Sequence, residues 1–151
     1  MNGNTEPAST LPMVLFICTG NTCRSPMAEL CFAGMLKGKV RSVSAGLYAF
    51  DGEAMSGNSL AVLAENGIDG SMFRSQSVTY DLVRESSLIL TMTASHRREL
   101  LMRVPEASEK CFTLLADADV SDPFGQSTGV YRETLAEIRR GLEKWKEFFE
   151  I

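Results

Sequence analysis

The chain is poor in the residues that hold metals. Among its 151 residues His96 is the single histidine, and none of the four cysteines forms a Cys-x-x-Cys pair. A structural zinc site needs several such ligands at close spacing, so the sequence argues against one, and we predict neither a metal nor another cofactor. Four cysteines are also too few for a disulfide scaffold in a chain of this length.

Long hydrophobic runs are absent as well. The first apolar run, residues 13–18, is too short for a membrane span or a secretory core, and no targeting signal is visible. We therefore expect a cytoplasmic protein without a membrane partner. Residues 1–12 are expected to be a disordered N-terminal tail, and residues 13–151 a single domain.

Positive charge is not in excess. The chain has 15 Lys and Arg against 19 Asp and Glu, a formal net charge of −4. Nucleic acids and anionic membranes attract basic surfaces, so we predict no nucleic-acid partner. A site for an anion must then be a local positive field within an acidic protein. Between a monomer and a weak homodimer the sequence does not decide.

Short apolar runs alternate with longer helical segments along the chain. Strands are predicted at 13–17, 40–45, 87–92 and 111–115, and helices at 25–37, 56–66, 81–85, 95–103 and 130–149. This alternation predicts an α/β fold, a parallel sheet with helices on both faces. Ligands of such folds bind at the carboxyl ends of the strands, and Cys18 lies at the carboxyl end of the first one.

The loop between the first strand and the first helix, residues 18–25, reads Cys-Thr-Gly-Asn-Thr-Cys-Arg-Ser. Gly20 and Asn21 tolerate a positive φ, so successive backbone N–H groups can turn inward. We expect Ser25 to cap the helix that Pro26 opens, and the positive end of that helix dipole adds to the field. The loop therefore predicts a cradle for an anion of phosphate size.

Cys18 is the candidate nucleophile of this loop. Amide dipoles, the helix start and Arg24 favour the thiolate, so we expect the pKa of Cys18 to fall well below that of a free cysteine. Ser25 is expected to add a hydrogen bond to the sulfur, and Arg24 to hold two phosphoryl oxygens. Asp122, followed by Pro123 in a later loop, is the candidate general acid.

These motifs resemble those of a known family. Residues 14–29, reading Val-Leu-Phe-Ile-Cys-Thr-Gly-Asn-Thr-Cys-Arg-Ser-Pro-Met-Ala-Glu, are similar to the phosphate loop of low-molecular-weight protein tyrosine phosphatases. Ser44-Ala45-Gly46 and Asp122-Pro123 resemble two further motifs of that family. The resemblance covers nearly the whole chain from Met13. It implies a three-layer fold with a four-stranded sheet, a phosphorylated protein as substrate, and the roles just given to the cysteine, the arginine and the aspartate.

The resemblance also implies supporting residues. The phosphate-binding loop then comprises Thr19, Gly20, Asn21, Thr22, Cys23 and Ser25. Asn21 and Ser44 are implied to hold the loop in shape. Cys23 is implied to trap oxidised Cys18 as a reversible disulfide, and a passive position in the loop stays open for it.

Two positions bear on the substrate. Tyrosine-directed members usually carry a bulky aliphatic residue where this chain has Thr22, and paired aromatics where it has Phe124-Gly125. Both features resemble the protein arginine phosphatase branch, so the sequence favours phosphoarginine without excluding phosphotyrosine. Phe124 is predicted either as one wall of the substrate cleft or as a core residue. Tyr48 is the candidate for the opposite wall, with a surface-loop anchor as the favoured alternative.

Two other functions compete with this interpretation. An arsenate reductase of the same fold needs relay cysteines after the third strand, and residues 93–103 contain none. A non-catalytic phospho-residue binding module can dispense with the nucleophile or the acid, yet both Cys18 and Asp122 are present. We further expect Cys31 and Cys111 in the core and His96, beside two arginines, on a solvated helix face.

Overall fold

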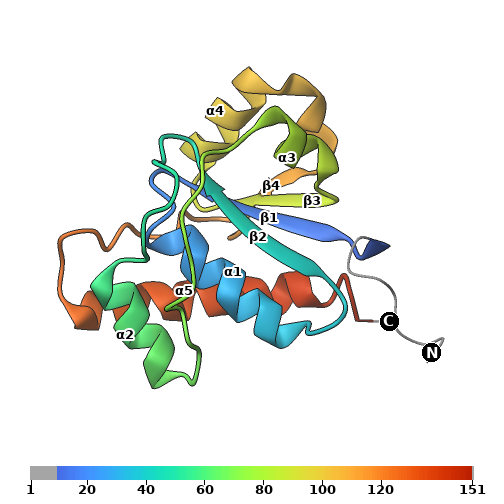
Figure 1. Ribbon diagram of the computed structural model, residues 1–151. Helices are drawn as coiled ribbons and strands as arrows, with labels where there is room; N and C mark the ends of the chain where they lie inside the picture. The colour runs from blue at the N-terminus through green and yellow to red at the C-terminus, as the bar shows by residue number, and fades with distance from the viewer. Residues whose placement is uncertain (1–9, 151) are drawn as a thin grey trace.

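A parallel sheet forms the centre of the computed structural model, which describes residues 10–150. Its strands are β1 (Met13–Cys18), β2 (Arg41–Gly46), β3 (Leu88–Thr91) and β4 (Cys111–Thr113). They lie in the order β2-β1-β3-β4, and all three neighbouring pairs are parallel (Figure 1). The predicted four-stranded α/β fold is therefore confirmed.

Helices cover both faces of the sheet, as predicted. On one face lie α1 (Arg24–Met35), α2 (Gly57–Glu65) and α5 (Thr128–Lys146), and on the other α3 (Tyr80–Glu85) and α4 (Ala94–Arg103) (Figure 1). One element was not predicted: a short 3-10 helix, η2 (Pro105–Glu109), directly follows α4. The proline that ends α4 is the first residue of this helix, where its missing N–H costs nothing.

The core has two parts because β1 is buried on both sides. All six residues of β1 are buried, as the continuous apolar run predicts for a central parallel strand. Val14, Phe16 and Cys18 face the cluster that packs under α1 and α5. Leu15 and Ile17 face the cluster under α3 and α4. Cys31 and Cys111 are buried in these clusters, as expected, and burial raises the pKa of each thiol to about 11.

The predicted disordered tail lies outside the described residues except for 10–12. Of these, Pro12 extends the pairing of β1 with β2, since its carbonyl accepts a hydrogen bond of 2.9 Å from the N–H of Arg41. Within residues 10–150, no helix is both long enough and apolar enough to cross a membrane.

The carboxyl ends of β1 and β2 meet where the predicted anion loop begins. Cys18 lies opposite Gly46 in the parallel register. A Cβ on Gly46 would lie 2.5 Å from the carbonyl oxygen of Thr19 and 3.1 Å from the amide nitrogen of Asn21. The glycine therefore lets the loop lie directly against the end of β2, which no other residue permits without moving the backbone.

Candidate active site

The backbone of the loop turns its carbonyls away from the site. The carbonyls of Cys18, Thr19 and Thr22 accept hydrogen bonds of 3.0, 2.9 and 2.9 Å from the N–H groups of Leu47, Tyr48 and Ser56, in that order. The amide of Asn21 instead points at the sulfur of Cys18, at 3.3 Å. Among residues 10–150, the N–H groups of Gly20, Thr22 and Cys23 have no acceptor. A ring of donors of this kind suits an oxyanion.

Asn21 holds this conformation. It is fully buried and has a φ of 57°, whereas Gly20 does not take a positive φ, so only one of the two expected left-handed positions is found. The Asn21 amide group donates to the hydroxyls of Ser25 and Ser44 at 2.9 Å each, and its oxygen accepts from the backbone N–H of Gln76 at 2.9 Å. The loop is thereby tied to α1, β2 and the segment before α3.

Ser25 is bound to the sulfur and does not cap the helix. Helix α1 begins at Arg24, and Cys23 at its N-cap position makes no side-chain capping bond, so the expectation that Ser25 caps it was wrong. The Ser25 hydroxyl lies 2.8 Å from the Cys18 sulfur. No side chain therefore caps the start of α1, and no acidic residue occupies the first turn to compete with an anion.

The pKa of Cys18 differs from the expectation. Burial raises the pKa of the thiol above its ordinary value, while the hydrogen bonds from Ser25 and Asn21 and the charge of Arg24 pull it down. The sequence pointed to the stabilising groups correctly and missed the cost of placing the sulfur on a fully buried strand end. The lowering effects of Ser25, Asn21 and Arg24 are thus outweighed by the effect of burial.

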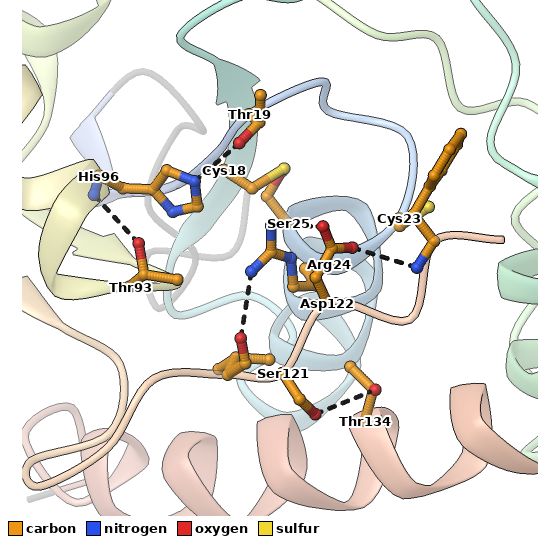
Figure 2. A network of polar contacts seen from close by, with 12 residues as sticks. Cys18, Thr19, Cys23, Arg24, Ser25, Thr93, His96, Ser121, Asp122 and Thr134 are labelled. Carbon is orange, nitrogen blue, oxygen red and sulfur yellow. Dashed lines mark hydrogen bonds and ion pairs between the residues drawn. The ribbon is translucent and has the colours of Figure 1, made fainter. Parts of the chain in front are cut away.

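Arg24 and Asp122 face each other across the site (Figure 2). The Arg24 guanidinium is almost fully buried; one terminal nitrogen donates to the carbonyl of Val120 at 3.1 Å, and the other lies 3.6 Å from an Asp122 carboxylate oxygen. Together with residues 18–23 and Phe124 they line a cavity of about 290 Å³. The structure thus brings together the nucleophile, clamp and acid candidates that lie 104 residues apart in sequence.

The walls of the cavity only partly match the prediction. The Asp122 side chain is 58% exposed, and its carboxylate accepts from the N–H of Phe124 at 3.1 Å. The Phe124 ring lies at the rim and is 75% exposed. Tyr48 is not among the lining residues; its ring packs under the guanidinium of Arg103, 5.1 Å from the ring centre, which fits the alternative of a surface-loop anchor.

Cys23 lines the cavity, and its sulfur contacts α5 and the residue that caps α2. The sulfur lies 3.4 Å from the Tyr131 hydroxyl and 3.4 Å from the hydroxyl of Ser56. All four cysteines are free thiols. The disulfide with Cys18 that the family resemblance implies stays a prediction.

Sequence reasoning missed His96. The residue is 8% exposed, not solvated as expected, and its Nε2 atom lies 2.9 Å from the Thr19 hydroxyl (Figure 2). The available signal was its spacing from Leu100, which is buried four residues later on the same face of α4. Glu29 was missed too: its carboxylate accepts a hydrogen bond of 2.6 Å from Ser44, and burial raises its pKa.

Within residues 10–150, no three His, Cys, Asp or Glu side chains are grouped so as to hold a metal ion. The residues that line the cavity carry a thiol, a guanidinium and a carboxylate. An anion seated on the amide ring would have the Cys18 sulfur at its base and Arg24 at its side.

One class of phosphatases has this architecture: a parallel sheet whose first strand ends in an anion cradle with a cysteine at its base. Comparison with known protein families agrees with this class. The sequence model described as low molecular weight phosphotyrosine protein phosphatase matches residues 13–150. The chain belongs to this family.

Three relatives illustrate the family's range. The chain is 36% identical over 134 residues to a probable low molecular weight protein-tyrosine-phosphatase, EpsP, of Ralstonia solanacearum, with 87% of this chain and 92% of that protein covered. It is also 36% identical over 139 residues to a protein-arginine-phosphatase of Geobacillus stearothermophilus, with 89% and 93% covered. The crystal structure of a low molecular weight protein tyrosine phosphatase from T. tengcongensis is 38% identical, with a TM-score of 0.85 and 90% and 98% covered. Because the identity to the first two relatives is equal, it does not distinguish a tyrosine from an arginine phosphatase, and the substrate must be argued from the site.

We expect Ser25→Ala to raise the pKa of Cys18 further, because it removes the shortest hydrogen bond to the sulfur. Below that pKa a smaller fraction of the sulfur is then ionised, so alkylation of Cys18 by iodoacetamide at neutral pH should slow roughly tenfold to a hundredfold. Mass spectrometry of the Cys18 peptide across a pH series measures this. Ser86→Ala, a buried serine at the end of α3, is the matched control, and equal rates in both variants would contradict the assignment.

Proposed function

We propose that this phosphatase hydrolyses phosphorylated side chains of proteins through a cysteinyl-phosphate intermediate, with Cys18 as nucleophile, Arg24 as clamp and Asp122 as general acid. One observation carries the proposal. The sulfur of Cys18, at the base of the 290 Å³ cavity, is hydrogen-bonded to Ser25, while the facing side chains of Arg24 and Asp122 line the same cavity.

In the first step the Cys18 thiolate attacks phosphorus and an S–P bond forms. The bond to the leaving oxygen or nitrogen breaks, and Asp122 gives its proton to that atom. The amide ring and Arg24 bind the phosphoryl oxygens throughout, so they stabilise the charge as the transition state flattens. The exposure of Asp122 at the rim suits this role, because the leaving group departs toward solvent.

In the second step water attacks the phosphorus of the cysteinyl phosphate. The Asp122 carboxylate takes a proton from that water, the S–P bond breaks, and the thiolate and inorganic phosphate are released. The Asp122 carboxylate lies 3.6 Å from the Arg24 guanidinium, beside the cavity in which this water attacks.

Phosphoarginine is the substrate class that we favour. Among the residues that the structure describes, Phe124 is the single aromatic ring that lines the cavity. Gly125 follows it and Tyr48 lies elsewhere, so a phenyl ring would be gripped on one side only. Thr22 also lines the cavity, and a threonine hydroxyl can orient water or a guanidinium. Transfer from phosphoarginine requires protonation of the leaving nitrogen, which Asp122 can supply.

The cytoplasm is the compartment that we propose. Four free thiols, one of them at the base of the cavity, persist only where the surroundings are reducing. A nucleophilic Cys18 would be lost to oxidation elsewhere.

Cys18→Ser should lower kcat for p-nitrophenyl phosphate by at least about 1,000-fold, because a hydroxyl is not ionised at neutral pH. Binding of inorganic phosphate, measured by calorimetry, should remain. Cys31→Ala, a buried cysteine outside the cavity, is the control for loss of a thiol. Substantial turnover by the serine variant would eliminate the covalent route.

Asp122→Asn should slow substrates with poor leaving groups by about 100-fold to 10,000-fold, since general acid catalysis has that range. The loss should be much smaller with p-nitrophenolate, which leaves without a proton. Rates on phenyl phosphate and p-nitrophenyl phosphate are compared, with Asp117→Asn in the same loop region as control. Equal losses on both substrates would remove Asp122 from the acid role.

Thr22→Ile should shift the ratio of kcat/KM for phosphoarginine over phosphotyrosine peptides about tenfold toward phosphotyrosine, because a bulky aliphatic group replaces the hydroxyl and packs against a phenyl ring. Thr22→Ser, which keeps the hydroxyl, should leave the ratio within about threefold of the parent value. An unchanged ratio in Thr22→Ile would refute the preference for phosphoarginine and leave the phosphatase mechanism untouched.

A further inference from the structure

His96 joins α4 to the phosphate loop. The N–H of His96 donates to the hydroxyl of Thr93 at 3.0 Å, which caps α4, and its ring reaches Thr19 with Nε2 at 2.9 Å from the hydroxyl oxygen (Figure 2). The imidazole is buried, although Thr19 is exposed at the cavity. The hydrogen bond therefore links an interior side chain to the lining of the cavity.

The ring is neutral at physiological pH. Burial and the nearby charge of Arg24 lower the pKa of His96 to about 4, against the opposite influence of Asp119, Glu99 and Asp122. A neutral imidazole carries one N–H and one bare nitrogen. The proton on this ring must therefore lie on either Nε2 or Nδ1.

The surroundings of Nδ1 decide between the two. This nitrogen is buried and has no hydrogen-bond partner within residues 10–150. A buried N–H without an acceptor is the rarer and costlier arrangement, while a bare lone pair is tolerated more readily. The lack of a partner at Nδ1 favours the tautomer with the proton on Nε2, in which His96 donates to the hydroxyl oxygen of Thr19.

This assignment fixes the hydroxyl of Thr19. Its oxygen accepts from His96, so its own proton must point elsewhere. Thr19 follows Cys18 directly and lines the cavity, so an oxyanion in the cavity is a candidate acceptor for that proton.

We propose that His96 is a positioning residue of the active site: by donating Nε2–H to Thr19 it turns the Thr19 hydroxyl into an additional hydrogen-bond donor for the phosphoryl group. The proposal rests on the proposed function, since the donor acts only if a phosphoryl group occupies the cavity. If His96 had only a structural role, the Thr19 hydroxyl would not contribute to phosphate binding.

The tautomer is tested directly by NMR. Because His96 is the single histidine, a long-range proton–nitrogen spectrum of untagged, nitrogen-15-labelled protein contains one imidazole. We expect a protonated Nε2 and an unprotonated Nδ1 at neutral pH. Protonation at Nδ1 instead would overturn the proposal, because Thr19 would then be the donor to the ring.

The function is tested by a double-mutant cycle of Thr19→Val and His96→Leu. Each single variant should lower kcat/KM for p-nitrophenyl phosphate and weaken inhibition by inorganic phosphate, each about fivefold to thirtyfold. The double variant should lose no more than Thr19→Val alone, because both changes remove the same donor. Additive losses, or an unchanged phosphate inhibition constant in Thr19→Val, would overturn the proposal.

His96→Gln supplies the rescue. Its side-chain amide can place an N–H near the position of Nε2, so it should recover activity to within about threefold of the parent while Leu does not. Recovery in both variants would contradict the proposal. Ser95→Ala on the exposed side of α4 controls for disturbance of the helix, and Thr19→Val keeps the test valid should His96→Leu fail to fold.

The experiments distinguish a failure of the His96 proposal from a failure of the proposed function. Turnover retained by Cys18→Ser would end the covalent mechanism whatever His96 does. If Cys18→Ser loses turnover while the losses of kcat/KM in the Thr19–His96 cycle are additive, only the role of His96 would be refuted.

Discussion

The side chain of Asn21 is the interaction on which the site depends. From one buried position its amide binds Ser25, Ser44 and the backbone of Gln76. These bonds hold a non-glycine residue in the left-handed region, a conformation that needs such support. With Asn21 fixed, its own N–H points at the sulfur and the neighbouring loop amides line one hollow. The cradle is thus set before any anion arrives, so binding need not order it.

The electrostatics of the site are a balance between burial and donors. The chain carries a net charge of −4, and the cysteine lies at the buried end of a central strand, both of which disfavour a thiolate. Four groups favour the thiolate instead: the hydroxyl of Ser25, the amide of Asn21, the uncapped start of α1 and the guanidinium of Arg24. The same low-dielectric surroundings that penalise the charge strengthen each of these contacts. A phosphoryl dianion would meet the same set of donors.

Most of the fold could be predicted from the sequence, because apolar periodicity reports which faces are buried. The apolar run at 13–18 corresponds to the central strand β1, and the helix predicted at 130–149 corresponds to the packed helix α5. Errors came where a side chain has a partner distant in sequence. Ser25 resembles a helix cap until the sulfur seven residues earlier is placed beside it. His96 resembles a surface residue next to two arginines until the loop around Thr19 is folded against it.

The sequence alone identified the candidates for the reacting groups: a cysteine and an arginine six residues apart on a strand-to-helix loop, and an aspartate before a proline. Local chain geometry suffices for these, since the loop is short and its dihedral preferences are narrow. Only the tertiary structure decided how Asp122 meets Arg24, why Gly46 must lack a side chain, and what His96 contacts. Each of these depends on segments that approach one another only when helices pack onto both faces of the sheet, and no local pattern encodes that distance.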